Sequence, residues 1–216
     1  MLCATRDRNI VDPTPPPPPS IPTHPDTLGE HGEWEKKSNF DVVVRVPLII
    51  HVPSKVHSQG KVTTSYIDLV DVFPTLSALA GLLPPQTNTT DGNDMSSLFD
   101  DPNQMLKTEA FHQYPACGMT QINMTRDSCN NVPSNQFNYM GYSIRNVDWR
   151  YTAWYEWDQS TLKPLWDGDQ FIDELYTHTG DDSSDMDKWE NVNVAAANPT
   201  VTALLKARLR TFFQQS

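Results

Sequence analysis

An α/β fold is predicted, because a strand-like run precedes a helix-like segment and an antiparallel hairpin follows later in the chain. Residues 41–53 are almost continuously apolar and β-branched, which is typical of a strand buried on both faces of a parallel or mixed sheet. Residues 71–80 place apolar side chains at helical spacing. Together the two segments predict one strand–helix unit of a larger sheet.

The helix has clear end signals. Asp71 suits the amino-terminal cap, and Pro74 is tolerated only in a first turn. Gly81 supplies a left-handed stop, and the prolines at 84–85 prevent continuation. The side chains expected on its buried face are Val72, Leu76, Leu79 and Ala80.

The second half of the chain predicts a smaller antiparallel region. Residues 139–145 and 149–157 alternate in character across a short turn, which predicts a hairpin. Residues 111–114 and 174–176 are expected to add short strands. A terminal helix should begin at Asn198 and Pro199, with a buried stripe. The stripe is expected to comprise Val201, Leu204, Leu205, Leu209, Phe212 and Phe213.

Composition divides the chain into three parts. Residues 1–27 include Pro13 and the run Pro15–Pro19, which favours polyproline II, so this segment is expected to be disordered. Residues 28–100 hold the strand–helix unit, and residues 101–216 hold the antiparallel region. A linker or translated non-coding sequence is favoured for the first part over a partner-binding proline motif.

Charge and hydropathy exclude two classes of partner. The net charge is -11 and no polybasic block is present, so nucleic acid is not expected to bind. No stretch approaches the roughly 20 apolar residues of a membrane helix. The first residues also lack the apolar core of a signal peptide.

Cysteines and glycosylation sequences point instead to the secretory pathway. Cys117 and Cys129 flank a polar loop and suit a disulfide, although two unrelated thiols are the alternative. Asn88 and Asn123 each begin an acceptor sequence for N-glycosylation. One of these sequences lies between the two cysteines, which favours an oxidising compartment.

Residues 29–36 form the most unusual stretch, Gly-Glu-His-Gly-Glu-Trp-Glu-Lys. The two glycines permit tight turns, so that Glu30, His31 and Lys36 can project from one loop at the end of a strand. A surface hydrogen bond between Glu30 and His31, with Lys36 lying along Trp34, is the alternative.

Several segments, taken in order, resemble the sulfatase family, and within it the iduronate-2-sulfatases. The resemblance covers roughly residues 28–215. Its segments are residues 28–36, 38–41, 46–49, 71–76, 80–82, 113–115, 140–145, 148–154, 174–176 and 190–192. It implies a partial sulfatase fold: the last strand–helix unit of the large sheet, plus the smaller antiparallel α+β carboxy-terminal subdomain.

The resemblance also implies roles for individual residues. Lys36 matches the lysine whose ammonium contacts the sulfate group, which suits a reaction that moves negative charge onto sulfate oxygens. His31 is a weaker candidate for the substrate site. Arg145 and Arg150 are interpreted as structural rather than as anion contacts, because they lie on the hairpin and not in the loop.

Two parts of the family's chemistry have no match here. The cysteine that becomes the formylglycine nucleophile is missing, and so are most carboxylates of the family's calcium site, so no metal ligand is assigned. The chain alone is expected to be inactive and to bind no calcium. The family's context is lysosomal or secretory glycosaminoglycan degradation, with sulfated glycosaminoglycan as substrate and an amino-terminal sulfatase half as an expected partner. A sugar-binding pseudoenzyme and a non-functional truncated product are the alternatives.

Overall fold

The structure is a computed structural model, and it describes residues 2–3, 27–28, 34–35, 37–82, 90–117, 129–168, 172–186 and 188–214. The chain forms two compact units, each described below by itself. The α2 unit contains Val46–Ala110 and the first residues of the chain. The sheet unit combines Pro25–Arg45 with Phe111–Ser216. The expected disordered segment falls almost entirely outside the described residues.

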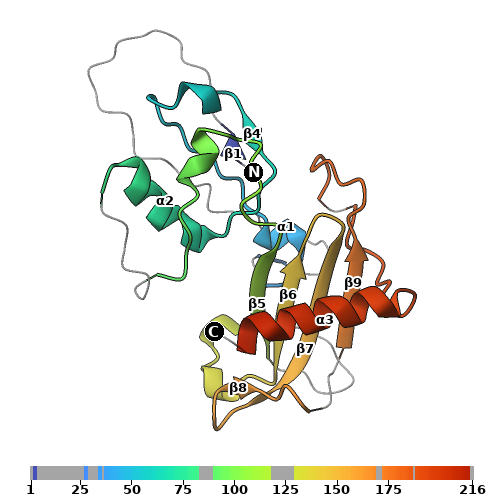
Figure 1. The fold of residues 1–216 in the computed structure, drawn as a ribbon. Helices are drawn as coiled ribbons and strands as arrows, with labels where there is room; N and C mark the ends of the chain where they lie inside the picture. The colour runs from blue at the N-terminus through green and yellow to red at the C-terminus, as the bar shows by residue number, and fades with distance from the viewer. Residues whose placement is uncertain are drawn as a thin grey trace. The chain divides into compact units, whose positions relative to one another are not determined.

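The sheet unit is built on an antiparallel sheet, as expected (Figure 1). The order is β5-β6-β7, and both β8 and β9 pair with β7. In the β6–β7 hairpin Met140 lies opposite Tyr155 and Ile144 opposite Tyr151. The strands are β5 (Ala110–Ala116), β6 (Tyr139–Arg145), β7 (Trp149–Asp158), β8 (Lys163–Pro164) and β9 (Ile172–Thr177). The predicted hairpin and both predicted short strands are therefore confirmed.

One face of this sheet carries the hydrophobic core. Alternate residues of each strand point to this face, because side chains on a strand alternate with a period of two. Helix α3 (Pro199–Gln214) lies across it in Figure 1 and packs on these side chains. The buried core consists of Met140, Tyr142, Ile144, Tyr151, Ala153, Tyr155, Leu175, Ala195, Leu205 and Leu209.

The terminal helix is confirmed, but its predicted stripe is too wide. Leu205 and Leu209 are buried, as their spacing of four residues allows. Leu204 is 69% exposed and Phe212 is 39% exposed. A helix lying on a flat sheet buries a narrow stripe, so apolar neighbours outside that stripe stay in solvent. Phe212 instead stacks on Phe111, with ring centroids 3.7 Å apart.

The predicted strand over residues 41–53 is wrong. Its first residues form the short helix α1 (Asp41–Val44), and residues 45–53 contain a single bridge residue, Leu48, and no strand. A strand buried on both faces needs paired neighbours on both edges, and apart from that bridge the described residues pair no strand with this run. Leu48 and Ile50 pack instead against Phe99.

The α2 unit holds the predicted helix. Helix α2 (Val72–Leu79) has Asp71 at its amino-terminal cap position, and Gly81 takes the left-handed φ of 69° after its end. A one-turn helix, η3 (Leu69–Asp71), leads into α2. Lys107 donates hydrogen bonds to the carboxylates of Asp68 and Asp71 and fixes this junction.

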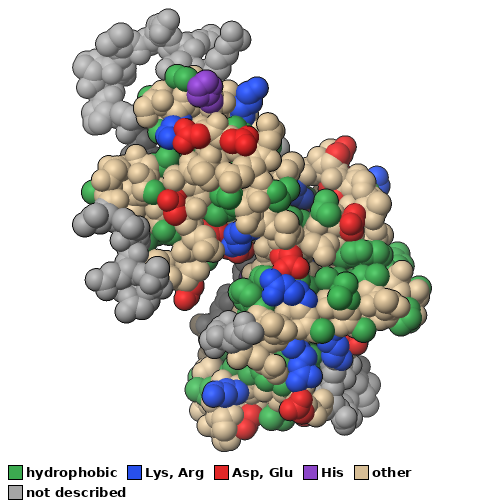
Figure 2. All heavy atoms as spheres, viewed as in Figure 1, with side chains coloured by type: hydrophobic (Ala, Val, Ile, Leu, Met, Phe, Trp, Pro, Cys, Tyr) green, Lys and Arg blue, Asp and Glu red, His purple; other side chains and the backbone are tan. Residues whose placement is uncertain are grey.

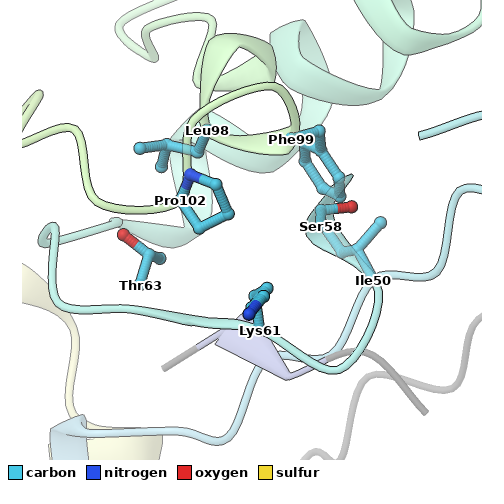
Figure 3. Close-up of a pocket in the computed structure, with 7 residues that line it drawn as sticks. All are labelled: Ile50, Ser58, Lys61, Thr63, Leu98, Phe99 and Pro102. Carbon is cyan, nitrogen blue, oxygen red and sulfur yellow. The ribbon is translucent and has the colours of Figure 1, made fainter. Parts of the chain in front are cut away.

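A small pocket lies within the α2 unit (Figure 3). Its lining is mainly apolar, and Lys61 is the charged residue among the seven that line it. The pocket has room for about one water molecule, so it offers no space for a sugar. The lining residues are Ile50, Ser58, Lys61, Thr63, Leu98, Phe99 and Pro102.

Candidate functional site

The glycine-rich loop lies between two short paired strands. Strand β2 (Thr27–Leu28) pairs antiparallel with β3 (Trp34–Glu35), and Leu28 lies opposite Trp34. Glu30, His31 and Lys36 fall outside the described residues, so their roles stay predictions. The structure does describe the chain from Lys37 onward, and residues 38–41 are buried. Ser38 is 0% and Asn39 is 4% exposed.

Asn39 explains a glycine in the hairpin. A Cβ atom on Gly141 would lie 2.5 Å from the Asn39 Nδ2 atom and 2.8 Å from the Trp154 ring. Contacts this short would force the Asn39 side chain and the Trp154 ring to shift. The glycine at position 141 therefore lets residues 38–40 pack directly on β6.

A buried ion network anchors the same segment through Asp41. We define this network as Asp41, Arg145, Arg150, His178, Asp181 and Glu190. The Arg150 Nη2 atom donates to the Asp41 carboxylate, and the Arg145 Nε atom lies 3.6 Å from Asp41 Oδ1. All three side chains are at least nine-tenths buried. Charges this deep in a protein are tolerated only when paired.

Arg150 links α1 to the segment that precedes α3. Its Nε atom lies 2.6 Å from Glu190 Oε1, and its Nη1 atom donates to the Ser143 hydroxyl at 3.0 Å. Glu190 in turn accepts the backbone N–H of Asp41 at 2.6 Å. Three segments distant in sequence, those around residues 41, 150 and 190, are thus held by one set of contacts.

His178 and Asp181 close the network. The His178 ring places Nδ1 3.0 Å from Asp181 Oδ2 and Nε2 2.8 Å from Glu190 Oε1. The Arg145 Nη2 atom lies 3.2 Å from the Asp181 carboxylate. Arg45, at the end of α1, adds an ion pair of 3.4 Å to each of Asp41 and Asp181.

The charges perturb one another in a consistent direction. Burial by itself would raise the pKa of Asp41, but the Arg150, Arg145 and His178 charges outweigh it and lower that pKa to about 2. Burial would likewise lower the pKa of Arg150, yet the neighbouring Glu190 and Asp41 carboxylates raise it. Both groups are held in their charged forms, so the network is a set of structural ion pairs rather than an acid–base pair.

The network does not fit a calcium ion. Asp41, His178 and Asp181 place one potential ligand atom each within 4.8 Å of one another. Calcium, however, takes six to eight oxygen ligands, and one of these three atoms is a ring nitrogen. The two carboxylates already pair with arginines, which occupy the place and supply the charge of a cation.

The structural role of Arg145 and Arg150 was predictable from the sequence, but their partners were not. Asp41 was interpreted as the start of a strand, and His178, Asp181 and Glu190 were given no role. Asp41 offered one signal in the sequence. Its carboxylate directly precedes an apolar run, and a buried carboxylate needs a cationic partner. The pairing itself depends on tertiary contacts between residues more than 100 positions apart.

His112 on β5 is a second perturbed group on this sheet. Burial, and then the nearby Arg150 charge, lower its pKa to about 4. Its Nε2 atom is buried and has no hydrogen-bond partner among the residues that the structure describes. The neutral ring is therefore the form that the fold prefers.

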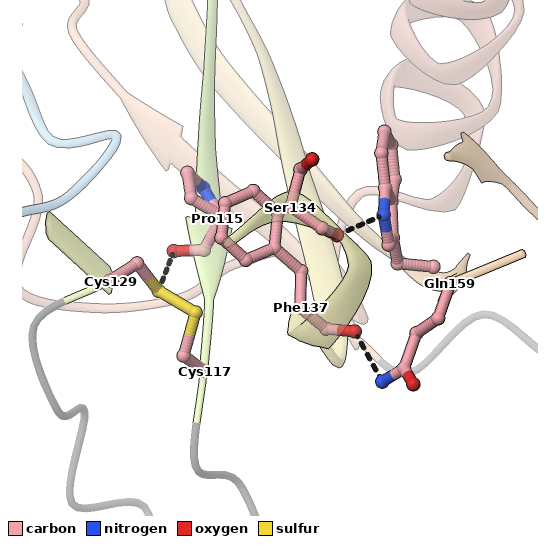
Figure 4. The surroundings of a disulfide bond; sticks show 7 residues. Pro115, Cys117, Cys129, Ser134, Phe137 and Gln159 are labelled. Atoms are coloured by element: carbon pink, nitrogen blue, oxygen red, sulfur yellow. Dashed lines mark hydrogen bonds between the residues drawn. A yellow bond between two sulfur atoms is a disulfide. The ribbon is translucent and has the colours of Figure 1, made fainter. Parts of the chain in front are cut away.

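A disulfide closes the loop between β5 and β6 (Figure 4). Cys117 and Cys129 are bonded, with their Cα atoms 5.6 Å apart. Figure 4 also shows the Cys129 sulfur beside the carbonyl of Pro115, 3.5 Å away. Asn123, between the two cysteines, and Asn88 both lie outside the described residues, so their glycosylation stays a prediction.

The surface carries mixed charge. On the face drawn in Figure 2, acidic and basic side chains are interspersed, and hydrophobic side chains gather near the start of α3. None of the helices that the structure describes has the length and apolar character needed to cross a membrane.

The known proteins that resemble this chain belong to one family. The family described as "N-sulphoglucosamine sulphohydrolase, C-terminal" matches residues 29–161. Iduronate 2-sulfatase of Mus musculus is 33% identical over 178 residues, which cover 62% of this chain and 31% of that protein. Iduronate 2-sulfatase of Homo sapiens is 32% identical over 169 residues, covering 59% of this chain and 30% of that protein.

A more distant relative extends the match along the chain. Arylsulfatase K of Bos taurus is 28% identical over 189 residues, covering 87% of this chain and 29% of that protein. The chain thus spans about 30% of the length of these relatives. Because the family match covers more than half of its residues, the chain belongs to the sulfatase family and corresponds to its carboxy-terminal part.

Proposed function

We propose that the chain is the carboxy-terminal portion of a sulfuric ester hydrolase that removes 2-O-sulfate from iduronate in heparan or dermatan sulfate. The observation that carries this proposal is its similarity to iduronate 2-sulfatases of two mammals, at 33% and 32% identity. In this proposal the chain contributes sulfate recognition, while the nucleophile belongs to the part of the relatives that the chain does not match.

Lys36 is the proposed sulfate contact, with His31 as a secondary contact. A fixed ammonium favours the reaction if it meets the sulfate oxygens more closely in the transition state than in the bound substrate. The segment Ser38 to Asp41 supports this role, because its burial and the hydrogen bond from the Asp41 N–H to Glu190 fix the chain close behind Lys36. Calcium would polarise the sulfate in the complete enzyme, but the ion network in this chain does not suit it.

The proposed compartment is the lysosome or the secretory pathway. The disulfide between Cys117 and Cys129 supports it, because such bonds persist in oxidising compartments. N-glycosylation at Asn88 and Asn123 is part of the same proposal.

Sulfate release from an iduronate 2-sulfate disaccharide tests the function. The chain is assayed alone and together with the unmatched amino-terminal portion of mouse iduronate 2-sulfatase, carrying its matured nucleophile. We expect release only from the mixture, and a loss of about 10²-fold or more with Lys36→Ala. Lys163→Ala, at an exposed site on β8, is the matched control. Release by the chain alone, or full activity of Lys36→Ala, would contradict the proposal.

A further inference from the structure

His178 is a buried histidine whose ring touches a carboxylate at each nitrogen. Its side chain is 1% exposed, and those of Asp181 and Glu190 are 5% and 2% exposed. The Nδ1 atom lies 3.0 Å from Asp181 Oδ2, and the Nε2 atom lies 2.8 Å from Glu190 Oε1. Because water has little access to the ring, each nitrogen depends on its carboxylate for a hydrogen bond.

Only the charged form of this ring satisfies both contacts. An ionised carboxylate accepts hydrogen bonds and donates none. The neutral imidazole donates through one nitrogen and carries a lone pair on the other, whereas the imidazolium ion donates through both. In the neutral ring one lone pair would therefore face a carboxylate oxygen, in a place too buried for water to relieve the repulsion.

Both carboxylates act as acceptors. Burial by itself would raise the pKa of Asp181, but the hydrogen bonds from the His178 ring and the Ser183 N–H outweigh it and lower that pKa. Glu190 also accepts from the Arg150 Nε atom and from the Asp41 N–H. A contact that favours a carboxylate ion favours an imidazolium ion equally, because its energy belongs to the pair.

Charged groups from every element packed around the ring belong to the buried ion network. The guanidinium groups oppose a positive ring and the carboxylates favour it. The carboxylates touch the ring nitrogens, whereas the guanidinium groups pair with the carboxylates, so the nearer interaction is the favourable one. Trp189 stacks on the ring at 6.2 Å between centroids, and the Lys188 ammonium lies over Trp189. The network groups are Asp41 on α1, Arg45 after it, Arg145 on β6, Arg150 on β7, Asp181 after β9 and Glu190 before α3.

Glu190 couples the ring to the segment that follows Lys36. Its Oε2 atom accepts the Asp41 N–H at 2.6 Å, while its Oε1 atom faces both His178 and Arg150. A change in the contact between His178 and Glu190 therefore acts on the same carboxylate that holds the start of α1.

We propose that His178 is an acid-sensitive clamp, whose doubly protonated ring bridges Asp181 and Glu190 and whose loss of one proton loosens the attachment of residues 38–41. The charged ring gains the contacts, so the clamp is present at low pH and is lost as the pH rises. Histidine changes charge between about pH 5 and about pH 8. The clamp itself does not depend on the reaction, and only its use in an acidic compartment rests on the proposed function.

Nitrogen-15 NMR of the full chain tests the state of the ring. We expect both His178 ring nitrogens to carry a proton at about pH 5, and one of them to have lost it by about pH 8. Amide hydrogen exchange, corrected for the intrinsic effect of pH, measures the consequence. The Asp41 N–H should lose about tenfold in protection over this range, as expected for a lost hydrogen bond to a charged group.

His178→Gln removes the titrating group and keeps a side chain that both donates and accepts hydrogen bonds. Protection of the Asp41 N–H should then no longer depend on pH. His51→Gln is the matched control, since His51 is exposed, and it should keep the dependence. His112 is present in both variants, so its own titration cancels in the comparison.

Three results would overturn the clamp: a single protonated nitrogen on His178 at the lower pH, equal protection of the Asp41 N–H at both pH values, or the same pH dependence in His178→Gln as in His51→Gln. The NMR result needs only the unmodified chain, so it decides the matter even if His178→Gln does not fold. None of these measurements involves sulfate release, so failure of the proposed function leaves them unaffected.

Discussion

The sheet unit and helix α2 differ in where their polar and apolar side chains lie. The sheet unit buries its apolar face under α3, and its other face carries buried ion pairs, such as those of Arg150 with Asp41 and Glu190. Helix α2 buries Asp71 and Thr75 and exposes Phe73, although the α2 unit also has a small apolar core around Phe99. The sheet unit thus covers its main apolar face, whereas part of the apolar surface of α2 faces solvent.

The energetic consequence differs between the two regions. In the sheet unit, removing one member of a matched set leaves a buried group without a partner, which is expensive. On α2, an exposed apolar side chain such as Phe73 contributes little to the stability of this chain. Substitutions in the two units therefore test this difference.

Arg150→Met should have the largest effect. It strips the partner from the Asp41 and Glu190 carboxylates, both buried, and should lower the free energy of unfolding by about 3–5 kcal/mol. Urea denaturation measures the loss. Asp167→Asn is the control, because it breaks the Arg210–Asp167 pair at a side chain that is 93% exposed, where we expect less than about 1 kcal/mol. Similar losses for both variants would show that the buried ion network contributes no more to stability than an exposed ion pair.

Leu209→Ala should follow, with a loss of about 2–5 kcal/mol, because Leu209 is 0% exposed between α3 and the sheet. Leu204→Ala lies on the same helix but removes a side chain that is 69% exposed. It should change the stability by less than about 0.5 kcal/mol. Comparable thermal unfolding shifts for the two variants would contradict the position of α3 on the sheet.

His112→Gln should change the pH dependence of stability. The pKa of His112 is lowered from 6.5 to about 4, so its stabilising contribution is complete above pH 6.5 and is lost as the pH falls through about 4. The variant should remove on the order of 1–3 kcal/mol of pH dependence in this window. The contribution of Asp41, whose pKa is lowered from 3.8 to about 2, should survive and disappear only below pH 4. Identical stability profiles for the variant and the unmodified chain from pH 7 to 4 would refute this assignment.

The smallest pair of effects concerns α2 itself. Thr75→Val keeps the side-chain volume but leaves the buried N–H of Met95 unpaired, and should cost about 1–3 kcal/mol. Phe73→Ser should stay within about 0.5 kcal/mol, since Phe73 is 63% exposed. Denaturation of the two variants compares a polar substitution inside with an apolar one outside. A larger loss for Phe73→Ser would mean that the Phe73 side chain is packed within the chain.

Local patterns predicted the elements that depend on local physics. The alternation of residues 139–157 predicted the β6–β7 hairpin, and Asp71 and Gly81 marked the ends of α2. Burial was less predictable, since Leu204 and Leu76 have helical spacing but face solvent.

Features that depend on contacts between residues far apart in the sequence could not be predicted. The apolar run at 41–53 indicated a strand, but strand formation needs neighbours, and Asp41 found its partners in Arg150 and Glu190 instead. The family resemblance supplied Lys36 as a candidate site residue. The anchoring of the segment behind it could come only from three-dimensional contacts.

Hydrogen exchange of the full chain compares the two regions in one measurement. We expect the amides of β6 and β7 to exchange more slowly than those of residues 69–82, because α3 covers the sheet whereas Leu69, Val70 and Phe73 are exposed. Protection of residues 69–82 that equals or exceeds that of β6 and β7 would contradict this difference.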